Sequence, residues 1–146
     1  MIRRLGEPVR RDIDYTLRPG AYVVLKRGDL VLLTHQSEPE PEVQLPGGGI
    51  DPGENPVAAL HREVLEETGW TMSLDRRIGA FRRFTYMPEY DLWAEKLCVI
   101  YLGRPCLRQG PPREPGHMAL WLPVAEAAEA VGNPIDRHVM AQLATA

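Results

Sequence analysis

Short apolar runs predict several β-strands along the chain. Residues 21–26 and 30–34 are rich in aliphatic and β-branched residues, and the glycine-containing turn between them predicts a hairpin. Residues 78–86 and 96–102 predict two further strands, and the second of these is almost entirely apolar, as is typical of a central strand covered on both faces. A short strand is expected at 118–122.

The apolar period becomes helical after Pro56. Asn55 is a favourable N-cap, proline suits the first helical position and Gly69 is a natural C-terminal cap, so a helix is expected at 56–68. Apolar and small residues recur there at three- and four-residue spacing. The expected inward stripe consists of Val57, Leu60, His61, Val64 and Thr68.

Glycine and proline mark the connections between these elements. The segment 45–56 is so rich in both that neither a helix nor a central strand is expected there. Further loops are expected at 37–42, 87–95 and 110–116, and further helices at 123–131 and 134–143. Strands with helices before and after them favour an α/β fold, in which helices cover both faces of a mixed sheet.

The length of 146 residues fits one domain of ordinary size. Residues 1–18 are charged and carry two arginine pairs, so we expect an N-terminal extension that folds back on the domain or stays mobile. Residues 19–146 are expected to form the single domain.

Composition narrows the choice of function. A net charge of −3 argues against a protein that coats nucleic acid, because non-specific binding needs excess positive charge. No apolar run approaches the roughly 20 residues of a membrane span, and the N-terminus lacks the apolar stretch of a signal peptide. Cys98 and Cys106 have no metal-ligand or disulfide-framework spacing. We therefore expect reduced thiols in a cytoplasmic protein with no membrane partner.

Candidate chemistry lies on the helix after the glycine-rich loop. Glu63, Glu66 and Glu67 fall within a sector of roughly 100° on the helix surface, where like charges repel. Taken alone, the three carboxylates favour a solvated acidic helix face, which is common. The preceding loop favours a metal site instead, because glycines let backbone groups approach a phosphate or a metal closely. Oxygen ligands of this kind suit Mg²⁺ or Mn²⁺.

The span from Gly48 to Trp70 resembles the Nudix box. Matching residues stand in register at Gly48, Glu54, Arg62, Glu63, Val64, Glu66, Glu67 and Gly69. Trp70 departs from the pattern, which has an aliphatic residue at that position, and it affects packing at the helix exit. So many fixed positions make the resemblance specific. It implies a Nudix fold, an α/β/α sandwich with a mixed β-sheet.

The resemblance also implies roles for individual residues. Glu63 and Glu67 would be the main metal ligands, and Glu66 a further ligand or the base that activates water. The carbonyl of Gly47 would also face the metal. Arg62 would pair with Glu54 and hold the loop against the helix, which agrees with its position away from the acidic face.

Three residues outside the box are further candidates. Family members often add a carboxylate from a later loop, and Glu114 is preferred here to Glu89, Asp91 and Glu95, although a surface glutamate is an equal alternative. Tyr86 could stack on a nucleobase. Arg82 could hold a substrate phosphate, although arginines near strands are more often solvated charges.

The implied activity is metal-dependent hydrolysis of the phosphoanhydride bond in a nucleoside diphosphate linked to another group. A nucleoside triphosphate or dinucleoside polyphosphate is preferred, since Tyr86 lies near the spacing of the diadenosine polyphosphate branch. Pro88 lies near the spacing of the ADP-ribose branch, so ADP-ribose and nucleotide sugars stay open. A non-catalytic nucleotide sensor and an RNA 5′-end pyrophosphohydrolase are further alternatives. A homodimer is compatible with the sequence.

Overall fold

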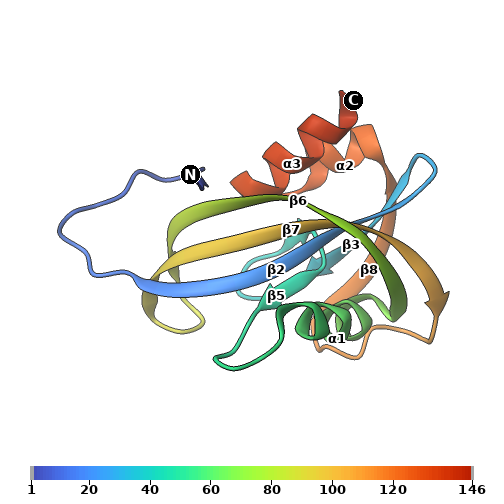
Figure 1. The fold of residues 1–146 in the computed structure, drawn as a ribbon, viewed down its shortest axis with the longest axis horizontal. Helices are drawn as coiled ribbons and strands as arrows, with labels where there is room; N and C mark the ends of the chain where they lie inside the picture. Colours follow the sequence, from blue (N-terminus) through green and yellow to red (C-terminus); the bar gives the residue numbers. More distant parts are fainter. Residues whose placement is uncertain (1, 146) are drawn as a thin grey trace.

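A computed structural model describes residues 2–145 as a mixed eight-stranded sheet between two helical layers. Helix α1 (Pro56–Thr68) lies on one side of the sheet, and α2 (Val124–Ala130) and α3 (Pro134–Ala144) lie on the other (Figure 1). This arrangement confirms the expected α/β/α sandwich. The strands are β1 (Arg3–Arg4), β2 (Thr16–Arg27), β3 (Leu30–Gln36), β4 (Glu42–Gln44), β5 (Gly47–Gly49), β6 (Trp70–Met87), β7 (Leu92–Arg108) and β8 (His117–Pro123).

The centre of the sheet is a long parallel pair. Strand β2 pairs with β7 over ten register partners, from Thr16–Ala94 to Leu25–Gly103. The strand order is β1-β6-β7-β2-β3-β4, with β5 paired to β2 and β8 paired to β3. Strands β6 and β7 are antiparallel, as are β2 and β3, so the sheet is mixed as expected.

The strands are longer than the sequence pattern predicts. Strand β2 begins at Thr16 rather than at residue 21, and the expected loop at 87–95 shrinks to residues 88–91 between β6 and β7. The strands continue beyond their apolar segments because the backbone groups of their polar ends pair with neighbouring strands, β2 with β7 and β6 with β7. Only their middle segments carry the apolar pattern that sequence analysis detects.

The glycine-rich segment contains a strand that was not expected. Gly47, Gly48 and Gly49 pair with β2 as the short strand β5. The prediction of a loop throughout 45–56 is therefore wrong at these three positions. A three-residue strand bound to one neighbour does not carry the cost of glycine within a longer central strand.

Helix α1 has the predicted bounds, but its buried face is rotated. The Asn55 side chain accepts from two backbone amides of the first turn, and Gly69 ends the helix in the left-handed region at φ 79°. Val57 and His61 are exposed, so the predicted stripe is wrong there. Ala59 and Glu67 are buried in their place, because the small alanine lets the helix approach the sheet along this side. The rotation brings a carboxylate to the inner face.

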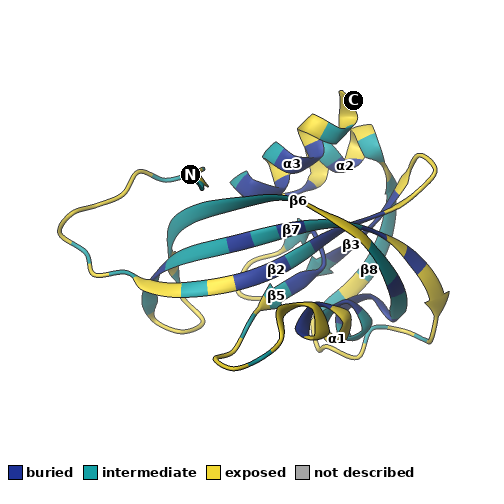
Figure 2. Cartoon of the chain, in the orientation of Figure 1, coloured by how far each residue is buried: buried dark blue, intermediate teal, exposed yellow. Residues whose placement is uncertain are grey.

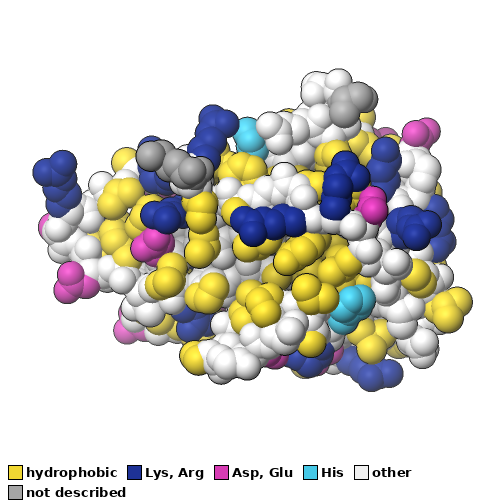
Figure 3. Space-filling view, in the orientation of Figure 1, with side chains coloured by type: hydrophobic (Ala, Val, Ile, Leu, Met, Phe, Trp, Pro, Cys, Tyr) yellow, Lys and Arg dark blue, Asp and Glu magenta, His cyan; other side chains and the backbone are white. Residues whose placement is uncertain are grey.

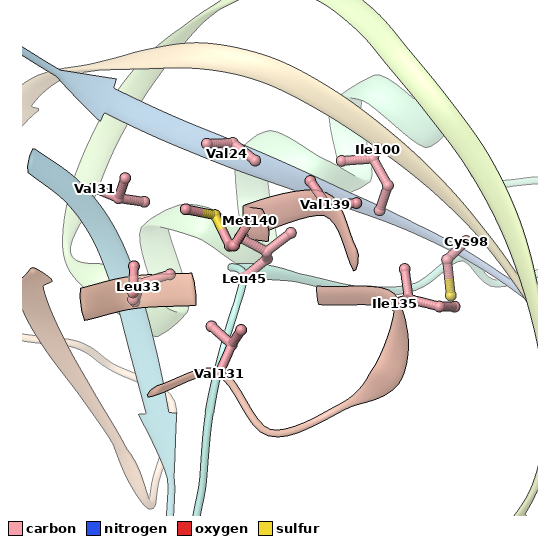
Figure 4. Close-up of a cluster of buried hydrophobic side chains, with 11 residues drawn as sticks. Val24, Val31, Leu33, Leu45, Cys98, Ile100, Val131, Ile135, Val139 and Met140 are labelled. Carbon is pink, nitrogen blue, oxygen red and sulfur yellow. The ribbon is translucent and has the colours of Figure 1, made fainter. Parts of the chain in front are cut away.

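Two apolar clusters hold the layers together. Beneath α2 and α3, Val24 and Ile100 of the sheet pack with Ile135 and Met140 of α3 (Figure 4). Beneath α1, Leu60 packs with Val23 and Leu32. Figure 2 shows burial concentrated in the middle of the sheet and on the inner helix faces. Fully buried aliphatic side chains each stabilise the fold by about 1.5–3 kcal/mol relative to exposure.

The N-terminal segment folds back on the sheet. Strand β1 pairs in parallel with residues 81–82 of β6, and the amide of Leu5 donates to the carbonyl of Arg82 at 2.8 Å. Tyr15 packs edge-to-face on Phe84 and Trp93. Residues 3–5 thus lie against the sheet, which agrees with the first of the two behaviours expected of the N-terminal segment. Within residues 2–145, no helix is long and apolar enough to cross a membrane.

Candidate functional site

Glu67 is the buried carboxylate of the acidic helix face. Its side chain is only 6% exposed, and its Oε1 accepts a hydrogen bond from the backbone N–H of Gly47 at 2.9 Å. Burial raises the pKa of Glu67 well above its ordinary value, and repulsion from Glu63, Glu114 and Glu66 raises it further. The fold thus holds a carboxyl group where its charged form is unfavourable unless a cation joins it.

The glycines of β5 make room for these carboxylates. A side chain on Gly47 would collide with the backbone carbonyl of Ala21, and its φ of 142° is one that other residues rarely adopt. A Cβ on Gly48 would lie 3.1 Å from the carboxyl carbon of Glu63. The Glu63 carboxylate therefore lies in a recess that any side chain at position 48 would fill.

Arg62 braces the loop against the helix, as expected. Its Nη2 donates to Glu54 at 2.9 Å, and its Nη1 contacts Glu63 at 3.2 Å and Glu66 at 3.3 Å. Glu54 also accepts from the amide of Asp51 at 3.0 Å, which closes the turn before the helix. One guanidinium thus neutralises part of the acidic face and fixes the direction in which its carboxylates point.

The loop at 110–116 brings Glu114 to the same site. Backbone amides of Arg113 and Glu114 donate to the carbonyl of Glu66 at 2.8 and 2.9 Å. These bonds satisfy the end of α1, whose last carbonyls have no partner within the helix. The exposed Glu114 then lies close enough to raise the pKa of Glu63 and Glu67 by repulsion. The structure therefore unites Glu114 with the box residues.

A second hydrogen-bond chain supports the end of α1 from behind. His117 Nδ1 lies 2.9 Å from the hydroxyl of Thr34, and that hydroxyl donates to the carbonyl of Glu67 at 3.4 Å. Burial lowers the pKa of His117. The sequence did not indicate Thr34, which looks like an ordinary residue of a β-rich run.

The donor chemistry of the site fits a hard divalent cation. Glu63, Glu66 and Glu67 offer oxygen ligands, and the recess at Gly48 keeps the space beside Glu63 open. Within residues 2–145, no three acidic, histidine or cysteine side chains already converge as a metal cage. Each box carboxylate instead has an N–H partner, on Arg62 or on Gly47. Ion binding would therefore exchange these partners through side-chain rotation.

A cavity of about 600 Å³ opens beside these carboxylates. Its floor includes Glu67 and β5, and its walls come from β6, β7, the start of α3 and the loop at 37–42. The polar wall residues include Glu40, Glu42, Arg83, Tyr86, Tyr90, Lys96, Cys98 and Asp136. Its volume falls within the range of small-molecule sites.

The two predicted substrate residues lie in different places. Tyr86 lines the cavity, and its hydroxyl donates to Asp91 across the turn between β6 and β7. Arg82 does not line the cavity and lies 3.5 Å from Glu95. Its neighbour Arg83 lines the cavity instead, because successive strand residues point to opposite faces. The role assigned to Arg82 stays a prediction without support from this position.

Several polar groups of the cavity escaped sequence analysis. Burial raises the pKa of Asp136 to about 6, and its carboxylate accepts from the amides of Leu45 at 3.0 Å and Asn133 at 2.7 Å. Burial likewise raises the pKa of Cys98 to about 11, so the thiol is protonated. Lys96 was a detectable signal, since a lysine at the start of an otherwise apolar strand needs a polar environment.

Comparison with known proteins decides the family. A sequence model of the NUDIX domain matches residues 16–143, which is nearly the whole chain. The chain belongs to the Nudix family. The solved structure of a Nudix hydrolase from Nitrosomonas europaea is similar in fold, with a TM-score of 0.72 over 89% of this chain and 90% of that one at 21% identity.

Curated relatives of this Nudix chain carry different names. A putative 8-oxo-dGTP diphosphatase of Bacillus subtilis is 36% identical over 74 residues, which are 51% of this chain and 50% of that protein. An RNA pyrophosphohydrolase of Helicobacter pylori is 51% identical over 39 residues, 27% of this chain and 25% of that protein. The human diphosphoinositol polyphosphate phosphohydrolase 3-alpha is 41% identical over 58 residues, 40% of this chain and 35% of that protein. The chain thus matches half or less of each relative's length.

Proposed function

We propose that this Nudix chain hydrolyses a phosphoanhydride bond of a nucleotide with the help of Mg²⁺ or Mn²⁺. The observation that carries the proposal is the buried carboxylate of Glu67 in the floor of the 600 Å³ cavity, beside Glu63 and Glu66. Carboxylates crowded in this way are stabilised when a divalent cation joins them. When bound, such an ion neutralises charge on the phosphates and makes a bound water more acidic.

Each acidic residue has a distinct proposed role. Glu63 and Glu67 are the main metal ligands, and the carbonyl of Gly47 is a further ligand. Glu66 is a ligand or the base that takes the proton of the attacking water, and Glu114 is the second candidate for that base. Arg62 is a positioning residue, because it contacts Glu54, Glu63 and Glu66 and so fixes their directions.

The cavity walls favour a small nucleotide over a long RNA or a densely phosphorylated ring. Glu40 and Glu42 line one side, and Glu89 lies beside Tyr86 and Tyr90 on the other. These acidic groups offset the positive charge of Arg83 and Lys96, so the cavity carries no excess positive charge for a long RNA, whereas the tyrosines offer faces for a nucleobase. On the face in Figure 3, basic side chains are dispersed among apolar ones. We propose a nucleoside triphosphate or dinucleoside polyphosphate as substrate.

The names of relatives supply candidates for the test. The panel contains nucleoside triphosphates, 8-oxo-dGTP, diadenosine polyphosphates, ADP-ribose and a 5′-triphosphorylated RNA fragment. Release of phosphate and pyrophosphate is measured with Mg²⁺, with Mn²⁺ and with chelator. Glu67→Gln is the inactive variant, and Glu129→Gln, an exposed position on α2, is the matched control.

The proposal requires a metal-dependent activity that Glu67→Gln abolishes and Glu129→Gln retains. Tight nucleotide binding without hydrolysis of any panel member would replace the enzyme with a nucleotide sensor. Preference for the RNA fragment over free triphosphates would overturn the proposed substrate class while keeping the chemistry.

A further inference from the structure

Three basic residues form a row across the cavity face of the sheet. Arg83 of β6 is the register partner of Lys96 of β7, and Lys96 is the register partner of Arg18 of β2. Directly opposed residues on neighbouring strands project from the same face. Arg83 and Lys96 line the cavity, and Arg18 stacks on the ring of Tyr90, which lines it too. We call these three residues the basic row.

The basic row leads away from the candidate metal site. Gly49 of β5 pairs with Gly20, which follows Arg18 by two residues, or about 7 Å along β2. The guanidinium of Arg18 also reaches back, with Nη2 lying 4.0 Å from where a Cβ of Gly49 would stand. Across the three strands the row extends over roughly 10 Å. It therefore begins beside the carboxylate recess and ends at β6.

Like charges opposite one another across strands destabilise a sheet, so the row needs compensation. Arg83 Nε lies 3.1 Å from Glu7 Oε1 of the N-terminal segment. The guanidinium of Arg18 lies 4.5 Å from the ring centre of Tyr90. Lys96 has no ion pair among the described residues. Burial raises the pKa values of Glu42 and Asp136, and the nearby charge of Lys96 offsets only part of that rise. One cation of the row is thus open to a ligand.

We propose that the basic row binds the phosphates of the substrate that lie beyond the bond being cleaved. A chain of three or more linked phosphates is long enough to lie along the row while one of its phosphates occupies the carboxylate site. A two-phosphate substrate such as ADP-ribose ends before Lys96. This inference rests on the proposed function, and it assigns substrate selection by phosphate number to Lys96, with Arg83 and Arg18 on either side.

Lysine-to-methionine variants test the row. The chain contains one other lysine, Lys26, which is exposed on β2 and lies outside the cavity. Lys96→Met and Lys26→Met are therefore matched variants, each removing one ammonium group at similar side-chain length. Circular dichroism confirms folding of both. Arg83→Met is the second variant. It removes a different cation of the basic row and so tests the same surface independently of Lys96.

Two measurements are made on each variant. Calorimetry records the affinity for inorganic tripolyphosphate and for pyrophosphate without divalent metal, so that the row is tested apart from catalysis. Steady-state kinetics with Mg²⁺ record KM and kcat for substrates with two, three and four linked phosphates. A charge-assisted contact contributes enough for its loss to weaken binding about tenfold.

The expected result is a selective loss. Lys96→Met and Arg83→Met weaken tripolyphosphate binding and raise KM for the longer phosphate chains about tenfold, whereas Lys26→Met changes neither. KM for two-phosphate substrates stays within twofold in all variants by comparison with wild type. An equal loss of affinity for short and long phosphate chains, or no loss for either, would overturn the proposed role of the basic row.

Failure of the row and failure of the proposed function give different results. If the wild-type protein hydrolyses no panel member and still binds tripolyphosphate through Lys96, the phosphate-binding role of the basic row stands and the proposed hydrolase activity is refuted. If hydrolysis is metal-dependent and KM is unchanged in Lys96→Met, the hydrolase activity stands and the role of the basic row is refuted.

Discussion

The cavity has two walls of opposite chemistry. One wall, called the acidic wall here, is β5 with Glu67 of α1, and just outside the cavity α1 and the loop at 110–116 present Glu63, Glu66 and Glu114. The other wall is the open face of β6, β7 and β2, and it presents the basic row with Tyr86 and Tyr90. The first wall derives mostly from one continuous stretch of sequence. The second derives from strands that are distant in sequence.

The difference separates reaction chemistry from substrate selection. A continuous loop and helix keep carboxylates at fixed spacing whatever the rest of the sheet contains. A wall built from separate strands can change one residue at a time, since each strand contributes only alternate side chains. We therefore expect substitutions in the acidic wall to change kcat and substitutions in the basic wall to change KM.

The largest expected effect comes from Glu67→Gln. The amide oxygen can still accept from the N–H of Gly47, so the fold is retained, but the negatively charged ligand proposed for the metal ion is lost. We expect kcat to fall about a thousandfold, the scale of losing an essential acid–base or ligand group. Initial rates with Mg²⁺ measure the change, and the thermal midpoint without metal serves as the control. Near-normal turnover would remove Glu67 from the chemistry.

The next effect concerns the other buried carboxyl, Asp136. Its pKa rises from 3.8 to about 6 on folding, so the native state holds a proton more firmly than the unfolded chain. Below pH about 4, burial of the protonated Asp136 does not lower the free energy of unfolding. Above pH about 6 the carboxyl is ionised in both states, and the free energy of unfolding is lower by about 3 kcal/mol.

Asp136→Asn tests whether the buried Asp136 carboxyl lowers the stability of the fold at neutral pH. The asparagine keeps one oxygen to accept from Leu45 and removes the titration, so it should be more stable than wild type at pH 7 and equal to it near pH 4. Urea unfolding across this pH range measures the difference. A wild-type stability that rises between pH 4 and pH 7 relative to the variant would contradict the sign.

A smaller effect is expected for Arg62→Met. Removal of the guanidinium frees Glu54, Glu63 and Glu66 from the one shared partner that holds their carboxylates in fixed directions. Groups that orient metal ligands contribute about 10–100-fold to activity or metal affinity. We expect kcat and Mg²⁺ affinity to fall together, as measured by rates over a metal titration. Arg76→Met, on the exposed part of β6, is the matched control.

The smallest effect is expected for Glu7→Gln. Glu7 holds Arg83 at 3.1 Å from a partly exposed position, and exposed ion pairs contribute only about 0–1 kcal/mol. We expect KM for a triphosphate to change about threefold or less, without a change in kcat. A change in kcat instead would mean that the N-terminal segment acts on the acidic wall.

Sequence alone predicts the acidic wall far better than the basic one. The bounds of α1, its Asn55 and Gly69 caps and the Glu54–Arg62 pair are all present as expected, because each depends on residues a few positions apart. The rotation of α1 escaped prediction, since Val57 fits the apolar period and the charged Glu67 does not, although Val57 is exposed and Glu67 is buried. The choice depends on how closely the helix approaches β2 and β5.

The basic wall escaped prediction because it depends on strand register. Arg82 and Arg83 are equivalent in the sequence, and only pairing with β7 decides that Arg83 faces the cavity while Arg82 faces Glu95. Arg18 fell within the segment regarded as an extension, although β2 already begins at Thr16. Register over distant strands is a property of the whole sheet.

The parallel pairing of β2 with β7 has a consequence for how the molecule folds. The register partners Thr16 and Ala94 are 78 positions apart, as are Arg3 and Phe81 of the β1–β6 pair. Contacts of such high sequence separation form only after a large loop has closed, which places the chain among slow folders, on timescales of about milliseconds to seconds. The loop and helix of the acidic wall need no such closure. During refolding, the carboxylate-bearing segment is therefore expected to gain its structure before the chain acquires the surface that recognises long phosphate chains.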